Sequence, residues 1–183
     1  MPFHDDFILR TAEHGDIDRL NALIRKSGVE LSQGFYSPEQ AQALTEHVFG
    51  VDTALVDDRT YYLVEAGNRI AACGGWSRRN TLYGGDQAKS GEDPLLDPAT
   101  QPARIRAFFV SPDFARRGLG MKLIAACQEA ALKAGFSAME LGSTMPGVPL
   151  YRAAGFEIVE EFEITLPGNI KAPLARMSKR LVP

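Results

Sequence analysis

The sequence has few of the residues that build disulfide frameworks and metal centres. It holds two cysteines and three histidines among 183 residues. Two cysteines are too few for a disulfide framework, and the apolar neighbours of Cys73 and Cys127 predict reduced thiols inside a core. The histidines are scattered and no Cys/His spacing resembles a site, so we expect no bound metal.

The sequence also lacks a strong charge and a long apolar run. The formal net charge is −3 and no region is strongly basic, which argues against nucleic acid as a partner. No apolar run approaches the roughly 20 residues that span a bilayer, so we expect no membrane partner. The first six residues hold no apolar signal core, which together with the reduced thiols favours a cytoplasmic protein.

The pattern of apolar residues predicts an α/β protein with a mixed sheet. Runs of branched and aromatic residues predict strands at 7–10, 60–65, 69–77, 104–110, 137–141, 156–166 and 171–181. Apolar residues at helical spacing predict helices at 16–26, 37–50, 118–134 and 148–154. Gly28 is expected to end the first helix. In the predicted order of elements, hairpins occupy the first half and a βαβ crossover occupies the second. This order predicts helices on both faces of the sheet.

The length and composition fit a single domain over residues 1–183. Hydrophobic residues make up 45% and charged residues 23%, which is ordinary for a globular protein with one core. Residues 78–102 contain three prolines and three glycines. This segment predicts a long loop inserted in that domain.

The stretch from Phe108 to Gly120, FFVSPDFARRGLG, has the features of a phosphate-binding turn. An apolar strand ends at Pro112, and two arginines and a Gly-x-Gly then precede a helix. Arginines at a helix start are unfavourable unless an anion lies there, because that end carries partial positive charge. Free N–H groups, small glycines and two cations together predict a site for a phosphorylated cofactor. The sequence has neither a Walker loop nor the third glycine of a dinucleotide fingerprint.

This stretch resembles the acetyl-coenzyme A signature of the GNAT superfamily of N-acetyltransferases, Gln/Arg-x-x-Gly-x-Gly/Ala after a Val-x-Pro strand end. A second run, LYRAAGF at 150–156, is similar to the Leu-Tyr-x-x-x-Gly-Phe of that family. The predicted element order also matches, so the resemblance covers nearly the whole chain and is weakest in 78–102 and the N-terminal third. It implies a GNAT-like fold, with a mostly antiparallel sheet of about six to seven strands and one parallel βαβ pair. It also implies transfer of an acetyl group from acetyl-CoA, as co-substrate, to a primary amine.

The resemblance further implies where the cofactor binds. A run of backbone amides would wrap the diphosphate. These amides belong to Arg116, Arg117, Gly118, Leu119, Gly120 and Met121. The main chain of Phe108 and Val110 would pair with the pantetheine arm, as an added strand pairs with a sheet edge. Thr144 falls where many members carry a cofactor-contacting Asn, and Ala115 replaces the first Gln or Arg of the signature.

The same resemblance implies the catalytic groups. An oxyanion would form near the backbone N–H of Val110, and Tyr151 fills the slot of the acid that protonates the departing thiolate. Packing on the core is the other interpretation of Tyr151. The strand before the signature carries no carboxylate, so ordered water is the default base, with Glu140 either a relay or a solvated strand residue. Cys127 lies at core spacing, which favours direct transfer over an acetyl-enzyme.

Four residues are candidates for contact with the acceptor. Phe35 and Tyr36 lie between the first two predicted helices, where the family forms its acceptor pocket, and Trp76 is a candidate that is also expected to be partly core. Arg106 either meets an anionic acceptor or is solvated. We expect a small-molecule amine as acceptor, and the superfamily's use of C-terminal strands favours a homodimer. A non-catalytic acyl-CoA binding module is the alternative function, and an unrelated nucleotide-phosphate binder is a third.

Overall fold

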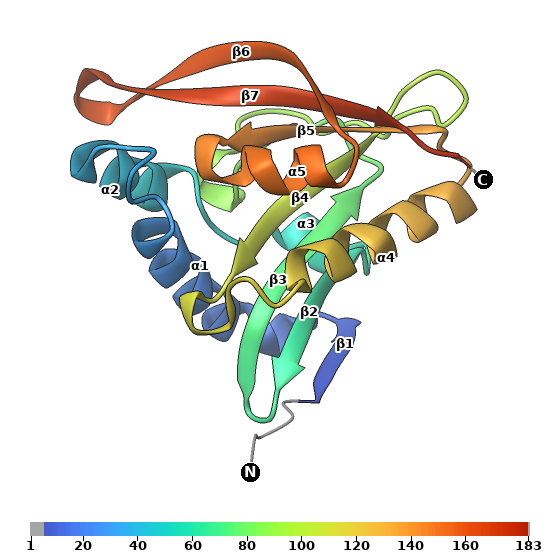
Figure 1. Cartoon of the computed structure of the whole chain (residues 1–183). Coiled ribbons are helices and arrows are strands. Elements are labelled where there is room, and N and C mark those ends of the chain that lie inside the picture. Colours follow the sequence, from blue (N-terminus) through green and yellow to red (C-terminus); the bar gives the residue numbers. More distant parts are fainter. Residues whose placement is uncertain (1–5, 183) are drawn as a thin grey trace.

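The sheet at the centre of the structure has seven strands in the order β1-β2-β3-β4-β5-β7-β6 (Figure 1). The computed structural model describes residues 6–182. Neighbouring strands run antiparallel except β4 and β5, which are parallel. This arrangement confirms the predicted mixed sheet with its parallel pair. The strands are β1 (Phe7–Thr11), β2 (Tyr61–Ala66), β3 (Arg69–Ser77), β4 (Ala103–Val110), β5 (Ala138–Thr144), β6 (Glu157–Leu166) and β7 (Ile170–Arg180).

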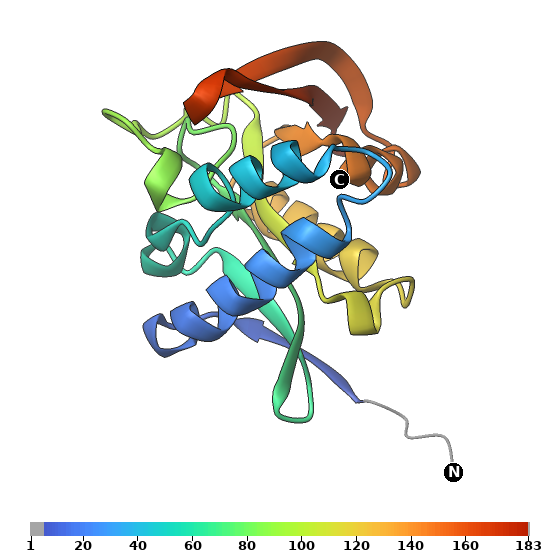
Figure 2. The ribbon, with the colours of Figure 1, turned by 90° about the vertical axis from the view of Figure 1, so that its left-hand side faces the viewer.

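Helices cover both faces of this sheet, as predicted. Helices α1 and α2 lie on one face, in front of the sheet in Figure 2, and α4 and α5 pack on the other. Each group buries its own set of side chains, with Leu20 and Leu44 in one core and Ile124 and Ala131 in the other. No helix in residues 6–182 is long and apolar enough to cross a membrane. The helices are α1 (Ile17–Glu30), α2 (Pro38–His47), α3 (Thr53–Asp57), α4 (Leu119–Lys133) and α5 (Val148–Ala153).

Two details of the helices differ from the sequence prediction. Helix α1 continues to Glu30, so the prediction that Gly28 ends it is wrong. Gly28 instead lets the chain after α2 pack closely, because a Cβ there would lie 2.7 Å from Cδ2 of Phe49. Helix α3 was not predicted, since five residues show too little periodicity, and the Asp52 carboxylate caps it by accepting a hydrogen bond from the Ala54 N–H at 3.0 Å.

Strand β4 leaves its parallel neighbour half-way along its length. The β4–β5 ladder pairs Ala103 with Met139 and Arg104 with Glu140, and β4 then continues to Val110 without β5 pairs. Ala107 has a φ of 53°, and the β3–β4 register shifts opposite it, which marks a bulge in β4. The bulge turns the second half of β4 away, so the two parallel strands diverge toward their carboxyl ends.

The segment 78–102 is irregular apart from the short 3-10 turn Asp86–Ala88, and it is tied to the rest of the fold. A bridge joins Arg79 to Leu95, and the Leu96 side chain is buried in the same core as Trp76. The Gln87 side-chain amide donates to the Phe49 carbonyl at 2.6 Å. The Gln87 contact holds the segment against the chain that follows α2, and Leu96 anchors it in the core.

We expect both thiols to resist alkylation in the folded protein. Cys73 and Cys127 are fully buried. Burial raises the pKa of Cys73 to about 12, and it also holds the pKa of Cys127 well above its usual range. Because the thiolate is the reactive form, iodoacetamide at neutral pH should add no mass to the native protein and should modify both cysteines after unfolding. Mass spectrometry checks this, and modification of either thiol in native protein would contradict it.

Candidate active site

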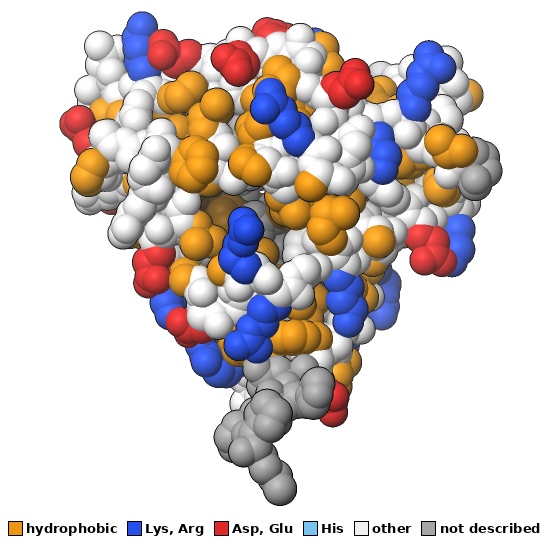
Figure 3. All heavy atoms as spheres, in the orientation of Figure 1, with side chains coloured by type: hydrophobic (Ala, Val, Ile, Leu, Met, Phe, Trp, Pro, Cys, Tyr) orange, Lys and Arg blue, Asp and Glu red, His pale blue; other side chains and the backbone are white. Residues whose placement is uncertain are grey.

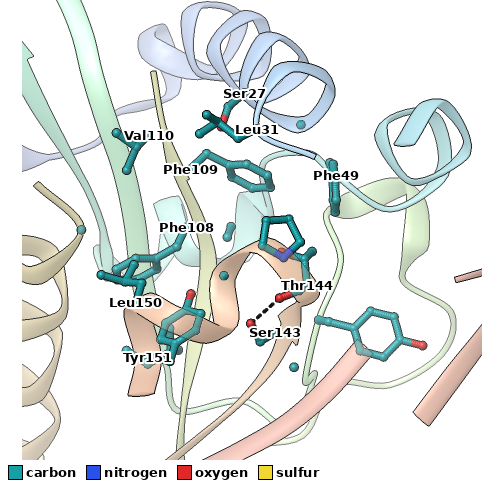
Figure 4. Close-up of a pocket in the computed structure, with 18 of the residues that line it drawn as sticks. Ser27, Leu31, Phe49, Phe108, Phe109, Val110, Ser143, Thr144, Leu150 and Tyr151 are labelled. Atoms are coloured by element: carbon teal, nitrogen blue, oxygen red, sulfur yellow. Dashed lines mark hydrogen bonds between the residues drawn. The ribbon is translucent and has the colours of Figure 1, made fainter. Parts of the chain in front are cut away.

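A cavity of about 710 Å³ opens where β4 and β5 diverge (Figure 4). Figure 3 shows a hollow at the centre of this face, flanked by hydrophobic side chains with basic side chains beside it. β4 divides the cavity, because Phe108 points toward Leu150 and Tyr151, whereas Phe109 points toward Leu31 and Phe49 (Figure 4). We call the first side the α4 half and the second the α1 half.

The start of α4 forms the far wall of the α4 half. Gly118 caps the helix in the left-handed region, with φ of 78°, and no acidic residue occupies the first turn. The first N–H groups of a helix have no partner inside it, so those of Leu119, Gly120 and Met121 are available to a ligand. Gly120 is tightly placed, since a Cβ there would lie 2.8 Å from a methyl of Leu150. This helix start can bind an anion.

The two arginines of the motif lie differently. Arg116 lines the cavity and has a φ of 65°. Arg117 places its guanidinium over the rings of Phe114 and Phe7, at 5.4 and 6.0 Å from their centroids. Arg116 is therefore placed to meet an anion inside the cavity, whereas Arg117, also predicted to bind the cofactor, does not line it.

The edge of β4 that faces the gap offers backbone donors. The Ser111 N–H bonds to the Ala71 carbonyl of the β3 side at 2.8 Å, and Phe109 pairs with Cys73. Amides alternate along a strand, so the N–H groups of Phe108 and Val110 face away from β3, toward the gap. Both residues line the cavity. A ligand in the gap can therefore bond to β4 in place of the missing neighbour strand.

Tyr151 stands at the end of the α4 half with its hydroxyl directed into the cavity (Figure 4). Its ring lies edge-on to those of Phe108 and Phe156, at centroid distances of 6.1 and 5.9 Å. Burial raises the pKa of the Tyr151 phenol well above its usual value. The group is therefore protonated at neutral pH and can donate to a group in the cavity. It also packs on the core, so both interpretations of Tyr151 describe its position.

Thr144 and Ser143 line the cavity at the end of β5. The Ser143 hydroxyl donates to the Thr144 carbonyl at 2.7 Å, which is the dashed line in Figure 4. Ser143 could not be predicted from the sequence, because a single hydroxyl on a strand carries no signal until the divergence of β4 and β5 is known. Phe49 and Phe109 were missed for the same reason, since apolar spacing alone assigns them to the core.

The structure separates the aromatic candidates for the acceptor. Phe35 lines the cavity and is 51% exposed. The Tyr36 hydroxyl is already used, since it donates to the Pro173 carbonyl at 2.7 Å and accepts from the Met145 N–H at 2.9 Å. Trp76 is buried against Phe136 in the core beneath α4 and α5 and does not line the cavity. Phe35 therefore remains a candidate for contact with the acceptor, whereas Tyr36 and Trp76 stabilise the fold around the cavity.

Arg106 lines the cavity but is 2% exposed, so the expectation that it could be solvated is wrong. Its guanidinium lies 3.0 Å from the Asp52 carboxylate and donates to the carbonyls of Thr81 and Gly84 at 3.2 and 2.5 Å. Burial lowers the pKa of Arg106, and Asp52 opposes that change. Lys89 also contacts Asp52, at 2.7 Å. The charge of Arg106 is thus balanced by a protein carboxylate.

No acidic residue lines the cavity in the part of the chain that the structure describes. Glu140 lies on the paired half of β5, where Arg176 donates to it at 3.1 Å and Arg104 lies 4.0 Å away. It is a partly exposed, ion-paired strand residue that does not line the cavity, so the structure places it away from where a relay would act. Among the described residues, no group of His, Cys, Asp and Glu could hold a metal ion.

Comparison with known proteins gives the family. The model described as the acetyltransferase (GNAT) family matches residues 25–156, more than half of the chain. The chain belongs to the GNAT acetyltransferase family. GNAT proteins are acyltransferases, and the two motifs at 110–120 and 150–156 both fall in or at the border of the matched region. No curated protein matches the chain.

Solved GNAT structures share the fold at low identity. A GCN5-related N-acetyltransferase from Rhodopseudomonas palustris is 17% identical with a TM-score of 0.70, over 95% of each chain. The yncA protein of Salmonella typhimurium, solved with its cofactor acetyl-CoA, is 13% identical with a TM-score of 0.63, over 97% of this chain and 95% of that one. The ribosomal-protein-S18-alanine N-acetyltransferase from Escherichia coli is 14% identical with a TM-score of 0.58, again over 97% and 95%.

We expect Tyr36→Phe to destabilise the fold. The substitution leaves the Pro173 carbonyl and the Met145 N–H without their partner in a partly buried place, and such a loss lowers the free energy of unfolding by about 1–3 kcal/mol. Urea denaturation measures it. The neighbouring exposed Phe35→Leu is the control and should change stability by no more than about 0.5 kcal/mol. Equal stability of the two variants would show that the hydroxyl does not hold the loop.

Proposed function

We propose that the protein transfers an acetyl group from acetyl-CoA to the primary amine of a small molecule by direct attack. The observation that carries this proposal is the gap between β4 and β5, which leads from the anion-binding start of α4 to the phenol of Tyr151. The acetyl-CoA bound by the Salmonella relative supports the choice of donor.

The α4 half offers groups for each part of this donor. The amides of residues 116–121 and the Arg116 side chain would hold the diphosphate. The Phe108 and Val110 main chain would pair with the pantetheine arm, as a strand added to a sheet edge. Thr144 lies across the gap on β5 and would contact the same arm.

The reaction needs an oxyanion donor and an acid. The amine nitrogen attacks the thioester carbonyl carbon, and the Val110 N–H stabilises the negative charge that develops on oxygen. The C–S bond then breaks, its electron pair goes to sulfur, and Tyr151 donates a proton to the thiolate. The nitrogen gives up its extra proton to water, from which Tyr151 is reprotonated. The products are the amide and free coenzyme A.

Direct attack is supported by the position of the two thiols. Cys73 and Cys127 are fully buried, and neither lines the cavity. A raised pKa keeps Cys127 protonated, which opposes a role as nucleophile. The acetyl group therefore passes to the amine in one transfer.

Incubation with acetyl-CoA and a mixed amine library, followed by mass spectrometry of the products, tests the function. We expect an N-acetylated amine and a matching amount of free thiol above the no-enzyme control. Binding of acetyl-CoA without any turnover would favour the acyl-CoA binding module, and tighter binding of ATP or NAD than of coenzyme A would favour the nucleotide-phosphate binder.

Met121→Glu should separate cofactor affinity from stability. Met121 is 41% exposed in the first turn of α4. A carboxylate there suits the helix dipole by about 0.3–1 kcal/mol but repels the diphosphate, so coenzyme A affinity should fall about ten-fold while the free protein melts no earlier. Calorimetric titration and thermal denaturation measure the two effects. Met121→Gln is the uncharged control, and equal affinity of both variants would place the diphosphate elsewhere.

Tyr151→Phe should lower kcat about 100-fold and leave coenzyme A affinity unchanged, because it removes a proton donor but keeps the ring packing. Since burial holds the phenol pKa above its usual value near 10, kcat of the wild type should show no loss from Tyr151 ionisation as pH rises toward 10. Tyr62→Phe, on β2 and outside the cavity lining, is the control. A wild-type rate for Tyr151→Phe would remove this residue from the mechanism.

A further inference from the structure

The α1 half of the cavity is walled mainly by apolar side chains, with Ser27 beside Leu31 as a polar group (Figure 4). Figure 4 shows Leu31, Phe49 and Phe109 directed toward one space, and Phe49 and Phe109 meet edge-on at 5.3 Å between ring centroids. Leu82 and Tyr83 from the 78–102 segment also line the cavity, and Tyr83 packs against the core on the α1 side. Such walls suit a hydrocarbon or aromatic body.

The charges around this half cancel without a ligand. Arg106 is balanced by Asp52 at 3.0 Å, and Lys89 lies 2.7 Å from Asp52 and 3.1 Å from Asp93. These four groups sum to zero. No carboxylate lines the cavity among the described residues. The α1 half therefore offers an acceptor no anion for a second ammonium and no unbalanced cation for a carboxylate, whereas Arg116 belongs to the α4 half.

The α1 half is also bounded by fixed contacts between distant segments. The Tyr83 ring lies 6.0 Å from that of Phe162 on β6, and the Gly85 N–H donates to the Val48 carbonyl at 2.8 Å. On the other side, Tyr36 joins the loop after α1 to Pro173 on β7. These ties leave a compartment for a compact molecule.

We infer that the acceptor is a hydrophobic monoamine, an aryl-alkyl or branched alkyl primary amine with no charge beyond its amino group, and that it reacts as the free base. This inference rests on the proposed acetyl transfer and narrows its acceptor. Alkylamines are mostly protonated at neutral pH, and an ammonium that enters an apolar compartment without a counter-ion loses its hydration. The proton therefore stays in water, and the neutral amine enters with its apolar body against Phe49 and Phe109.

Acceptance of the free base accounts for the lack of a carboxylate base at the cavity. A neutral amine attacks without prior deprotonation, and the one proton it loses after attack passes to water. Recognition then comes from the apolar body of the acceptor and not from its charge.

A matched set of acceptors tests the inference. With wild-type protein and acetyl-CoA, kcat/KM for 2-phenylethylamine should exceed by at least about ten-fold the values for phenylalanine, spermidine and a lysine peptide, because each of these adds a charge or a polar chain. Below the pKa of 2-phenylethylamine, its kcat/KM should fall about ten-fold per pH unit, as the free base does.

A charge placed in the compartment should change the preference. Leu31 is 37% exposed at the rim, so Leu31→Asp should fold, and it should raise the spermidine to 2-phenylethylamine ratio of kcat/KM about ten-fold. Leu31→Asn, equally polar but uncharged, should not raise this ratio. Coenzyme A affinity, measured by calorimetry, should be the same in both variants and the wild type.

The outcomes separate this inference from the proposed function. Acetylation in which spermidine, phenylalanine or the peptide is the best substrate overturns the inference and leaves acetyl transfer intact. An unchanged ratio in Leu31→Asp overturns the place assigned to the acceptor. Failure to acetylate any amine overturns both the inference and the proposed function.

Discussion

The divergence of two parallel strands is the constraint on which the rest of the site depends. A strand interior is stable when both edges are paired, yet β4 keeps β5 as a partner only to Arg104 and Glu140. The bulge at Ala107 turns the remaining half of β4 aside and leaves its backbone donors open to the gap. Because β4 keeps its β3 partner through Ala72 and Val110, the fold tolerates this open edge. The open edge of β4 beside β5 can therefore bind an extended ligand as an added strand.

The same divergence explains why one cavity can serve two molecules. Phe108 and Phe109 are adjacent in sequence but point to opposite sides of β4, toward α5 and toward α1 respectively (Figure 4). In the proposed reaction, a phosphorylated donor would meet its cations and amides on the first side, and an apolar acceptor would meet aromatic walls on the second. The thioester would lie between them at the open edge, where both can reach it.

Much of this architecture could be predicted from the sequence, and the limits have physical causes. The Gly-x-Gly after two arginines located the α4 start, since charge and helix polarity conflict there in any fold. Local patterns gave the strands and most helices, but Gly28 was misread because its role lies in packing against Phe49. Likewise, the residues next to Arg106 in the sequence do not indicate that Asp52, Thr81 and Gly84 surround its side chain. Pairings that long loops bring together cannot be read from either partner alone.

The way Arg106 holds the 78–102 segment has a consequence for how such a site can change. The Arg106 guanidinium donates to the backbone carbonyls of Thr81 and Gly84, and every residue type has such a carbonyl. The side chains of Leu82 and Tyr83, which line the cavity, take no part in these hydrogen bonds. The position of this part of the cavity wall therefore does not depend on which side chains residues 82 and 83 carry. Substitutions at Leu82 and Tyr83 can therefore reshape this wall while the start of α4 stays as it is, so the acceptor specificity of such a protein could change without a change in the proposed donor site.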